Sequence, residues 1–276
     1  MTLPNFFIAG APKSGTTSLY HYLDQHPEIY MSRIKEPHYF ASEIRLERFS
    51  RRLRPRVERD ARALEEYFKG PMLERRFGGP VTEWSNYVKL FEHADGHKAI
   101  GEASVCYLWS ESAAGNIRAK IPNAQIILVL RDPVEMVFSL YRHTLRSGST
   151  QCTLREAIQM GLAQRGGELD VFHPFLDFGL YHGQVKRVLE TFSHDHVRIF
   201  WYQDFQAQPL QMLAELFRFL GVDPTFCPDM SKRYLESEQP KFLPEPGDRV
   251  CLREFFRPDI EKLAGLLGRD LSDWLI

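Results

Sequence analysis

The stretch FFIAGAPKSGTTSLYHYL, residues 6–23, constrains the fold more than any other part of the chain. An apolar run ends at Gly10, a loop of small residues follows, and a helical pattern begins near Thr16. Phosphate-binding loops have this order, because backbone N–H groups and the positive end of the helix face an anion. The Walker A pattern places a lysine directly after its second glycine, whereas Lys13 stands two residues before Gly15. The stretch predicts either an anion site of unusual design or a tight turn that packs a helix on a sheet.

Strand-like and helical patterns alternate along the rest of the chain. Short apolar runs typical of strands buried on both faces occur at residues 6–10, 99–101, 124–130 and 197–201. Apolar stripes with helical spacing occur at residues 134–145, 180–192 and 210–220. The alternation predicts an α/β, P-loop-like three-layer fold with a central, mainly parallel β-sheet flanked by helices.

Three long stretches interrupt the alternation, at residues 42–79, 161–178 and 233–249. We expect one domain over residues 1–276, in which the first two stretches form lids or substrate-binding inserts. The first holds eight arginines between Arg45 and Arg62. These arginines either recruit an anionic acceptor or form a solvated helix face.

The composition excludes several classes of protein. A formal net charge of -1 provides no broad basic surface for nucleic acid, so an anion site has to be a local pocket. We find no run of about 20 apolar residues and no leader pattern, and therefore expect a cytoplasmic protein without a membrane span. The four cysteines form no C-x-x-C pair, which argues against zinc and favours free thiols, with a Cys227–Cys251 bridge as the alternative. Nothing in the sequence indicates an oligomeric state.

A second stretch, IILVLRDPVEMVFSLYRH, predicts another anion-binding element. Arg131 follows an apolar strand, Asp132 is suited to cap a helix, Pro133 suits a first helical position, and Ser139 lies two turns further on. Ligands of open α/β sheets bind at the carboxyl ends of strands, where the Arg131 fork and the Ser139 hydroxyl suit a terminal phosphate. Alternatively, Arg131 pairs with a surface carboxylate.

The two stretches together resemble a known family. P-K-S-G-T-T-S followed by L-R-D-P-x-x-x-x-x-S is similar to the two nucleotide-binding signatures of sulfotransferases that use 3′-phosphoadenosine 5′-phosphosulfate (PAPS). The first signature resembles the loop that holds the 5′-phosphosulfate, and the second resembles the element that holds the 3′-phosphate. IKEPHYF, GEASVCYL, GLYHGQVKRVLETF and LGRDLSDWL resemble the branch that contains heparan-sulfate sulfotransferases and their bacterial relatives. That branch often has an arginine where Met136 stands, so part of the 3′-phosphate cradle is missing or supplied elsewhere.

The resemblance implies a set of site residues. Glu102 takes the place of the catalytic base, which suits a carboxylate in a partly dry cleft, although a capping or ion-pairing glutamate is the alternative. Lys13 would stabilise the bridging oxygen and Lys35 the sulfuryl oxygens. His38 is the rival to Glu102, because a histidine is the base in the cytosolic branch, and His143 is a further candidate. The residues implied in cofactor binding are Lys13, Ser14, Gly15, Thr16, Thr17, Ser18, Arg131, Ser139 and Tyr181, with residues 233–249 as a cofactor-side loop.

The implied reaction is in-line transfer of a sulfuryl group from PAPS to an acceptor hydroxyl of a glycan or small molecule. Adenosine 3′,5′-bisphosphate (PAP) would be the other product, and positive side chains would take the part that a metal ion takes in phosphoryl transfer. Two other interpretations stay open: a divergent P-loop kinase or NTPase that needs magnesium and ATP, and a nucleotide-binding protein without catalytic activity.

Overall fold

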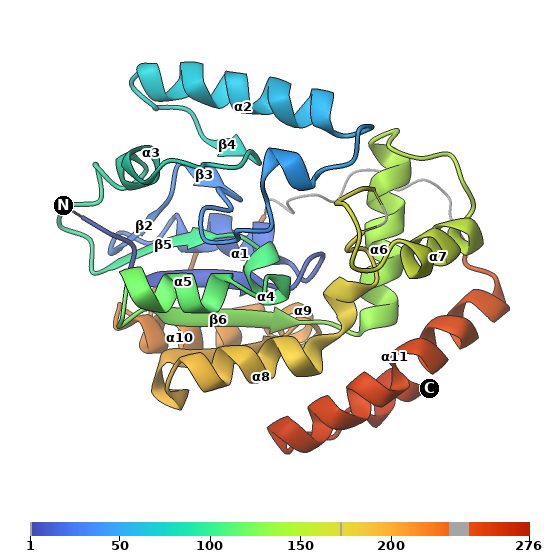
Figure 1. Cartoon of the computed structure of the whole chain (residues 1–276). Coiled ribbons are helices and arrows are strands. Elements are labelled where there is room, and N and C mark those ends of the chain that lie inside the picture. The colour runs from blue at the N-terminus through green and yellow to red at the C-terminus, as the bar shows by residue number, and fades with distance from the viewer. Residues whose placement is uncertain (1, 172, 232–242) are drawn as a thin grey trace.

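The computed structural model describes residues 2–171, 173–231 and 243–276. Its main sheet has five strands, all paired in parallel, in the order β2-β5-β1-β6-β7. The predicted α/β fold with a central parallel sheet is therefore confirmed (Figure 1). The strands are β1 (Phe6–Gly10), β2 (Ile29–Met31), β5 (Ala99–Ala103), β6 (Gln125–Leu130) and β7 (Val197–Trp201).

Helices cover both faces of this sheet. Successive strand residues point to opposite sides, and the residues on both sides are apolar, so each face packs against helices. Along β6, Ile127 and Val129 belong to one apolar cluster, which includes α1 (Thr16–Leu23) and α10 (Pro209–Leu220). Ile126 and Leu128 belong to the other, which includes α5 (Ala113–Lys120) and α8 (Tyr181–Thr191). The chain therefore forms the three layers that the alternating pattern predicts. The short helices between these elements are α3 (Trp84–Lys89), α4 (Cys106–Trp109) and α9 (Tyr202–Ala207).

The element after β6 begins as the sequence predicts. The Asp132 side chain accepts hydrogen bonds from the backbone N–H groups of Val134 (2.8 Å) and Glu135 (3.4 Å), so it caps α6 (Pro133–Arg146). Arg253 donates to Asp132 from two guanidinium nitrogens, at 2.9 and 2.8 Å, and also to the carbonyl oxygen of Trp274. This buried fork joins the C-terminal residues to the start of α6.

Residues 42–79 are more regular than the predicted lid. They contain α2 (Arg54–Lys69) and β4 (Arg76–Phe77), which pairs in parallel with β3 (Ile34–Lys35) in a second, two-stranded sheet. The buried side chains of α2 are Leu64 and Tyr67, and its arginines lie on the more exposed faces. The insert is thus a packed layer at one side of the main sheet (Figure 1).

The second insert, residues 161–178, contacts the first. It begins in the last turn of α7 (Leu154–Ala163), and the backbone of Leu169 bonds to Arg48 and to Ser50 at 2.7 and 2.9 Å. The predicted loop at 233–249 is shorter than expected, because α11 (Pro246–Leu267) begins inside it; residues 232–242 lie outside the described residues. All four cysteines are free, as predicted. In the part of the chain that the structure describes, we find no helix with the length and apolarity of a membrane span.

Candidate active site

The loop between β1 and α1 has the backbone of an anion-binding turn. Lys13 and Gly15 adopt left-handed conformations, with φ of 58° and 78°. A Cβ atom at Gly15 would lie 2.9 Å from the Phe205 ring, so only glycine fits there without displacing that ring. The helix begins at Thr16 without a side-chain cap, which leaves the N–H groups of its first turn available to an anion.

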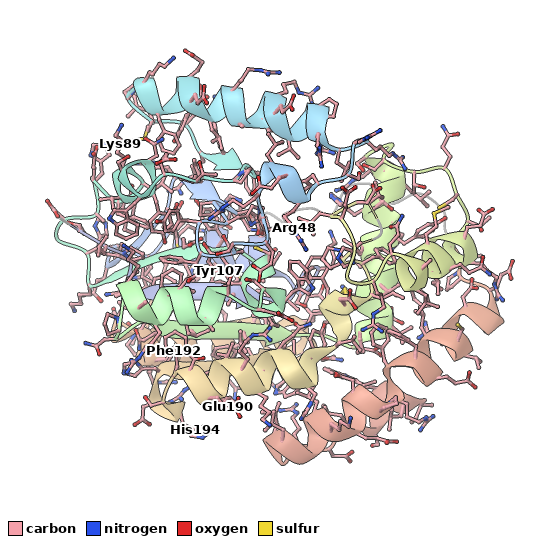
Figure 2. All side chains as sticks on the ribbon, in the orientation of Figure 1. Arg48, Lys89, Tyr107, Glu190, Phe192 and His194 are labelled. Atoms are coloured by element: carbon pink, nitrogen blue, oxygen red, sulfur yellow. The ribbon has the colours of Figure 1, made fainter. Side chains whose placement is uncertain are left out.

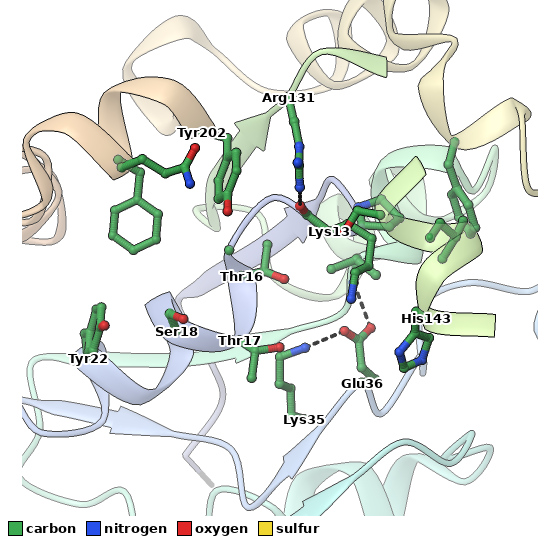
Figure 3. A pocket seen from close by; sticks show the side chains of 18 of the residues that line it. Lys13, Thr16, Thr17, Ser18, Tyr22, Lys35, Glu36, Arg131, His143 and Tyr202 are labelled. Carbon is green, nitrogen blue, oxygen red and sulfur yellow. Dashed lines mark hydrogen bonds and ion pairs between the residues drawn. The ribbon is translucent and has the colours of Figure 1, made fainter. Parts of the chain in front are cut away.

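A cavity of about 650 Å³ lies against this loop (Figure 3). Both predicted anion-binding elements line it, although they lie more than a hundred residues apart in the sequence. The Arg131 guanidinium donates to the carbonyl oxygen of Lys13 (2.7 Å) and lies 4.6 Å from the centre of the Tyr202 ring. Arg131 therefore joins the two elements, and among the described residues no carboxylate forms an ion pair with it. The predicted residues that line the cavity are Lys13, Gly15, Thr16, Thr17, Ser18, Lys35, Arg131, Ser139 and His143.

Positive charge dominates the cavity. Lys13, Lys35, Arg131 and Arg142 line it, and Glu36 is the one carboxylate among its described lining residues. Burial, together with Arg146 and Arg131, lowers the pKa of Lys13 to about 8. Burial also lowers the pKa of Arg131. Because these cations crowd one another, a ligand with several negative charges would stabilise all of them.

Glu36 is the functional candidate that sequence analysis missed. Its carboxylate lies 2.6 Å from the Lys35 ammonium and accepts a hydrogen bond from the Val105 backbone (2.9 Å). Burial alone would favour the neutral acid, but Lys35 and His38 hold the pKa of Glu36 below its ordinary value. The signal was present in the motif IKEPHYF, where Glu36 follows Lys35 directly. A carboxylate that is ionised and reaches the cavity can accept a proton there.

The position of Glu102 differs from the prediction that it is the base. Its side chain is 0% exposed and does not line the cavity. The carboxylate accepts hydrogen bonds from the hydroxyls of Tyr107 (2.7 Å), Ser104 (2.8 Å) and Tyr87 (3.0 Å). Burial raises the pKa of Glu102 to about 7. We correct the predicted role, because an acceptor hydroxyl in the cavity does not meet a carboxylate enclosed by three other hydroxyls.

Three other predicted residues also lie outside the cavity lining. The ring of His38 contacts the Cys106 sulfur at 3.0 Å, and burial lowers its pKa. Ser14 is fully buried and its hydroxyl contacts the Pro12 carbonyl oxygen (3.3 Å). Tyr181 is fully buried in the main apolar cluster. The resemblance had assigned these residues by motif position, which does not reveal the direction of a side chain.

The arginine that the resemblance expects at position 136 has no counterpart there. Met136 is completely buried in the main apolar cluster, so this position faces the core. Tyr202 and Arg142 line the cavity without having been predicted. Tyr202 follows β7 directly, so the rule that ligands meet the carboxyl ends of parallel strands could have found it. Among the described residues, no group of three or more His, Cys, Asp or Glu side chains is arranged to hold a metal ion.

Comparison with known proteins identifies the family. Residues 4–226 match the model of the Sulfotransferase family. The chain belongs to this family. Over 318 residues, covering 99% of this chain, it is 26% identical to human carbohydrate sulfotransferase 15. It is also 26% identical, over 99% of its length, to bifunctional heparan sulfate N-deacetylase/N-sulfotransferase 4 of Mus musculus.

The sulfotransferase fold is supported by a solved structure. A crystal structure of a sulfotransferase from Alicyclobacillus acidocaldarius is 31% identical, with a TM-score of 0.80 and 99% of each chain covered. The chain spans 54% of carbohydrate sulfotransferase 15 and 31% of the bifunctional enzyme. The similarity to these two longer proteins therefore concerns one part of each.

Proposed function

We propose that this sulfotransferase moves a sulfuryl group from PAPS to an acceptor hydroxyl. The observation that carries the proposal is the meeting of two anion-binding elements in one cation-rich cavity. The loop at residues 12–18 would hold the 5′-phosphosulfate through its backbone N–H groups and hydroxyls, and Arg131 with Ser139 would hold the 3′-phosphate. PAPS supplies the sulfuryl group when bound, and these two elements would hold its two charged ends.

The catalytic part of the proposal assigns the proton to Glu36. A neutral hydroxyl must lose its proton as the bond to sulfur forms, and Glu36 is the one carboxylate among the described residues that line the cavity. Lys13 and Lys35 surround the same region of the cavity and would stabilise the negative charge that develops there (Figure 3).

For the acceptor, we propose a hydroxyl of a glycan or a related small molecule. The names of the two longer relatives refer to a carbohydrate and to heparan sulfate. The lining beyond the cations includes Leu140 and Phe178, which offer apolar surface, and His143, which offers a polar ring. Such a mixture suits a sugar ring, which has both apolar faces and hydroxyl edges.

Binding assays with PAP and with ATP plus magnesium test the donor site. We expect PAP to bind more tightly, because both of its phosphates meet the predicted elements and no lysine follows Gly15. A preference for ATP would instead support the kinase or NTPase interpretation. A panel of hydroxyl-bearing acceptors with labelled PAPS then tests transfer; tight PAP binding without transfer to any of them would support the non-catalytic interpretation.

A further inference from the structure

The segment that carries Lys35 and Glu36 has a conformation that its own sequence does not favour. Glu36 and His38 both adopt left-handed backbone conformations, with φ of 67° and 59°, on either side of Pro37. Each such non-glycine residue is strained and persists only where surrounding contacts fix it. The contacts that fix this turn therefore determine where the Glu36 carboxylate points.

The end of β5 supplies these contacts. Glu36 donates its backbone N–H to the Ala103 carbonyl oxygen (2.8 Å), and the Val105 N–H donates to the Glu36 side chain (2.9 Å). The N–H of His38 donates to the hydroxyl oxygen of Ser104 (3.1 Å). Ala103, Ser104 and Val105, which follow Glu102 in the sequence, thus hold the turn through three hydrogen bonds.

A second contact of the same kind lies two residues further along the chain. The N–H of Phe40 donates to the hydroxyl oxygen of Tyr107 (3.3 Å), and Tyr107 lies inside the molecule (Figure 2). Ser104 and Tyr107 therefore both accept a backbone N–H from the segment that follows Glu36. Both hydroxyls also contact one carboxylate, that of Glu102, at 2.8 and 2.7 Å.

The direction of these hydrogen bonds is fixed by chemistry. A backbone N–H can only donate, so each hydroxyl oxygen accepts from the backbone and directs its own proton elsewhere. The carboxylate of Glu102 receives both protons, and that of Tyr87 as a third. A glutamine at this position could not accept all three, because one of its two terminal atoms is a donor.

We propose that Glu102 is a positioning residue that holds the Glu36–His38 turn in place through the hydroxyls of Ser104 and Tyr107. It thereby directs the Glu36 carboxylate into the cavity without touching the substrate. The proposal rests on the proposed function, in which Glu36 receives the proton of the acceptor. It also assigns a role to the Glu102 carboxylate, which is buried outside the cavity lining and so does not act as the base.

Two single substitutions test the proposal, and Tyr87→Phe is the matched control. Ser104→Ala removes the contact to the His38 N–H, and Tyr107→Phe removes the contact to the Phe40 N–H. Tyr87→Phe removes a hydrogen bond to the same Glu102 oxygen as Tyr107, but no described backbone N–H of residues 36–40 donates to Tyr87. Ser104→Thr keeps the hydroxyl and serves as the rescue variant.

The first readout needs no substrate. Amide hydrogen exchange, followed by NMR at pH 8, should become at least about tenfold faster for His38 in Ser104→Ala and for Phe40 in Tyr107→Phe. Tyr87→Phe and Ser104→Thr should change either amide by less than about threefold.

The second readout is turnover of labelled PAPS with an acceptor that the wild-type protein uses. Ser104→Ala and Tyr107→Phe should lower kcat at least about tenfold, while the Kd for PAP stays within about threefold. Equal effects of Ser104→Ala, Tyr107→Phe and Tyr87→Phe in both readouts would overturn the positioning role. Absence of transfer by the wild-type protein would contradict the proposed function alone, because the exchange measurement still decides whether the turn is held as described.

Discussion

At the scale of single residues, the half-buried Glu36 and the fully buried Glu102 show how two carboxylates in one protein acquire different properties. Glu36 has an ammonium 2.6 Å away and a pKa below its ordinary value. Glu102 has three hydroxyl donors and no cation among its described hydrogen-bond and ion-pair partners, and burial raises its pKa to about 7. Two carboxylates whose surroundings shift their pKa values in opposite directions are suited to different tasks.

The proposed base can be tested by Glu36→Gln. We expect kcat to fall by about 100-fold or more, because a general base typically contributes that much to the rate. The Kd for PAP should change by less than about threefold, since the residues proposed to hold the phosphates are unchanged in this variant. Glu135→Gln is the control, because Glu135 lies outside the cavity lining and pairs with Arg249. Comparable turnover by Glu36→Gln and Glu135→Gln would exclude Glu36 as the base.

Glu102 also predicts a pH dependence of stability. Its pKa is higher in the folded protein, at about 7, than the ordinary value of 4.5, so folding favours the protonated form. The stability that this group contributes is fully present below pH 4.5 and is lost as the pH rises through about 7. The free energy of unfolding of the wild type, minus that of Glu102→Gln, should therefore fall by up to about 3 kcal/mol across this window. Urea unfolding of both proteins at several pH values measures this difference in unfolding free energy. A difference that does not vary with pH would contradict the raised pKa of Glu102.

At this scale the sequence predicted which residues belong to the site better than it predicted where their side chains point. The motifs predicted Lys13, Lys35, Arg131 and Ser139, and all four line the cavity; Lys13 and Arg131 follow β1 and β6 at the carboxyl edge of the sheet. Glu102 lies near the carboxyl end of the neighbouring strand β5, yet its side chain is fully buried. Alternation along a strand decides this direction, and a short apolar run does not show which face holds the site.

At the scale of elements, the Arg131 end of the cavity depends on a contact between two helices far apart in sequence. Asp132 caps α6 and immediately follows Arg131, and the buried Arg253 of α11 holds Asp132 with a two-pronged contact. The start of α6 is therefore positioned partly by the C-terminal helix.

The substitution Arg253→Lys tests this connection. A lysine keeps the charge but cannot make both contacts to Asp132, so we expect a loss of about 2 kcal/mol in unfolding free energy and several-fold weaker PAP binding. Arg257→Lys is the matched control one turn further along α11, where Arg257 is about half exposed and lies 3.9 Å from Glu261. That variant should stay within about 0.5 kcal/mol of the wild type. Equal PAP affinity in the two variants would show that α11 does not position Arg131.

The sequence predicted the boundaries of several elements well where local signals are strong. The run at residues 6–10 and the run at 197–201 match β1 and β7, and Gly221 ends α10 in a left-handed conformation. Residues 42–79 were predicted less well, because β4 forms only by pairing with β3, a contact between distant residues. The hydrogen bonds of such a strand are decided by tertiary structure and leave little trace in the sequence.

At the scale of the whole molecule, a nearly neutral chain forms a strongly positive cavity. The formal net charge is -1, yet the described residues that line the cavity include four Lys or Arg side chains and one carboxylate. The sequence could exclude a broad basic surface, but only the fold shows that residues 13, 35, 131 and 142 converge. An anion that neutralises these charges should stabilise the entire folded state.

Thermal or urea unfolding with PAP measures this stabilisation. PAP at one hundred times its Kd should raise the free energy of unfolding by about 2.7 kcal/mol, if it binds only the folded protein. Adenosine at the same concentration should give a much smaller increase, because it lacks both phosphates. An equal increase with adenosine would indicate that the base and ribose, and not the phosphates, are recognised.

The hydrogen bond between Arg131 and the Lys13 carbonyl has a practical consequence for identifying the acceptor. Lys13 contributes its ammonium to the cavity and its main chain to Arg131, so exchanging the side chain leaves the link between the two elements intact. A Lys13→Met protein should keep the shape of the pocket and lose much of the chemistry. Such a variant could hold donor and acceptor together without converting them, and the retained acceptor could then be eluted from the protein and identified by mass spectrometry.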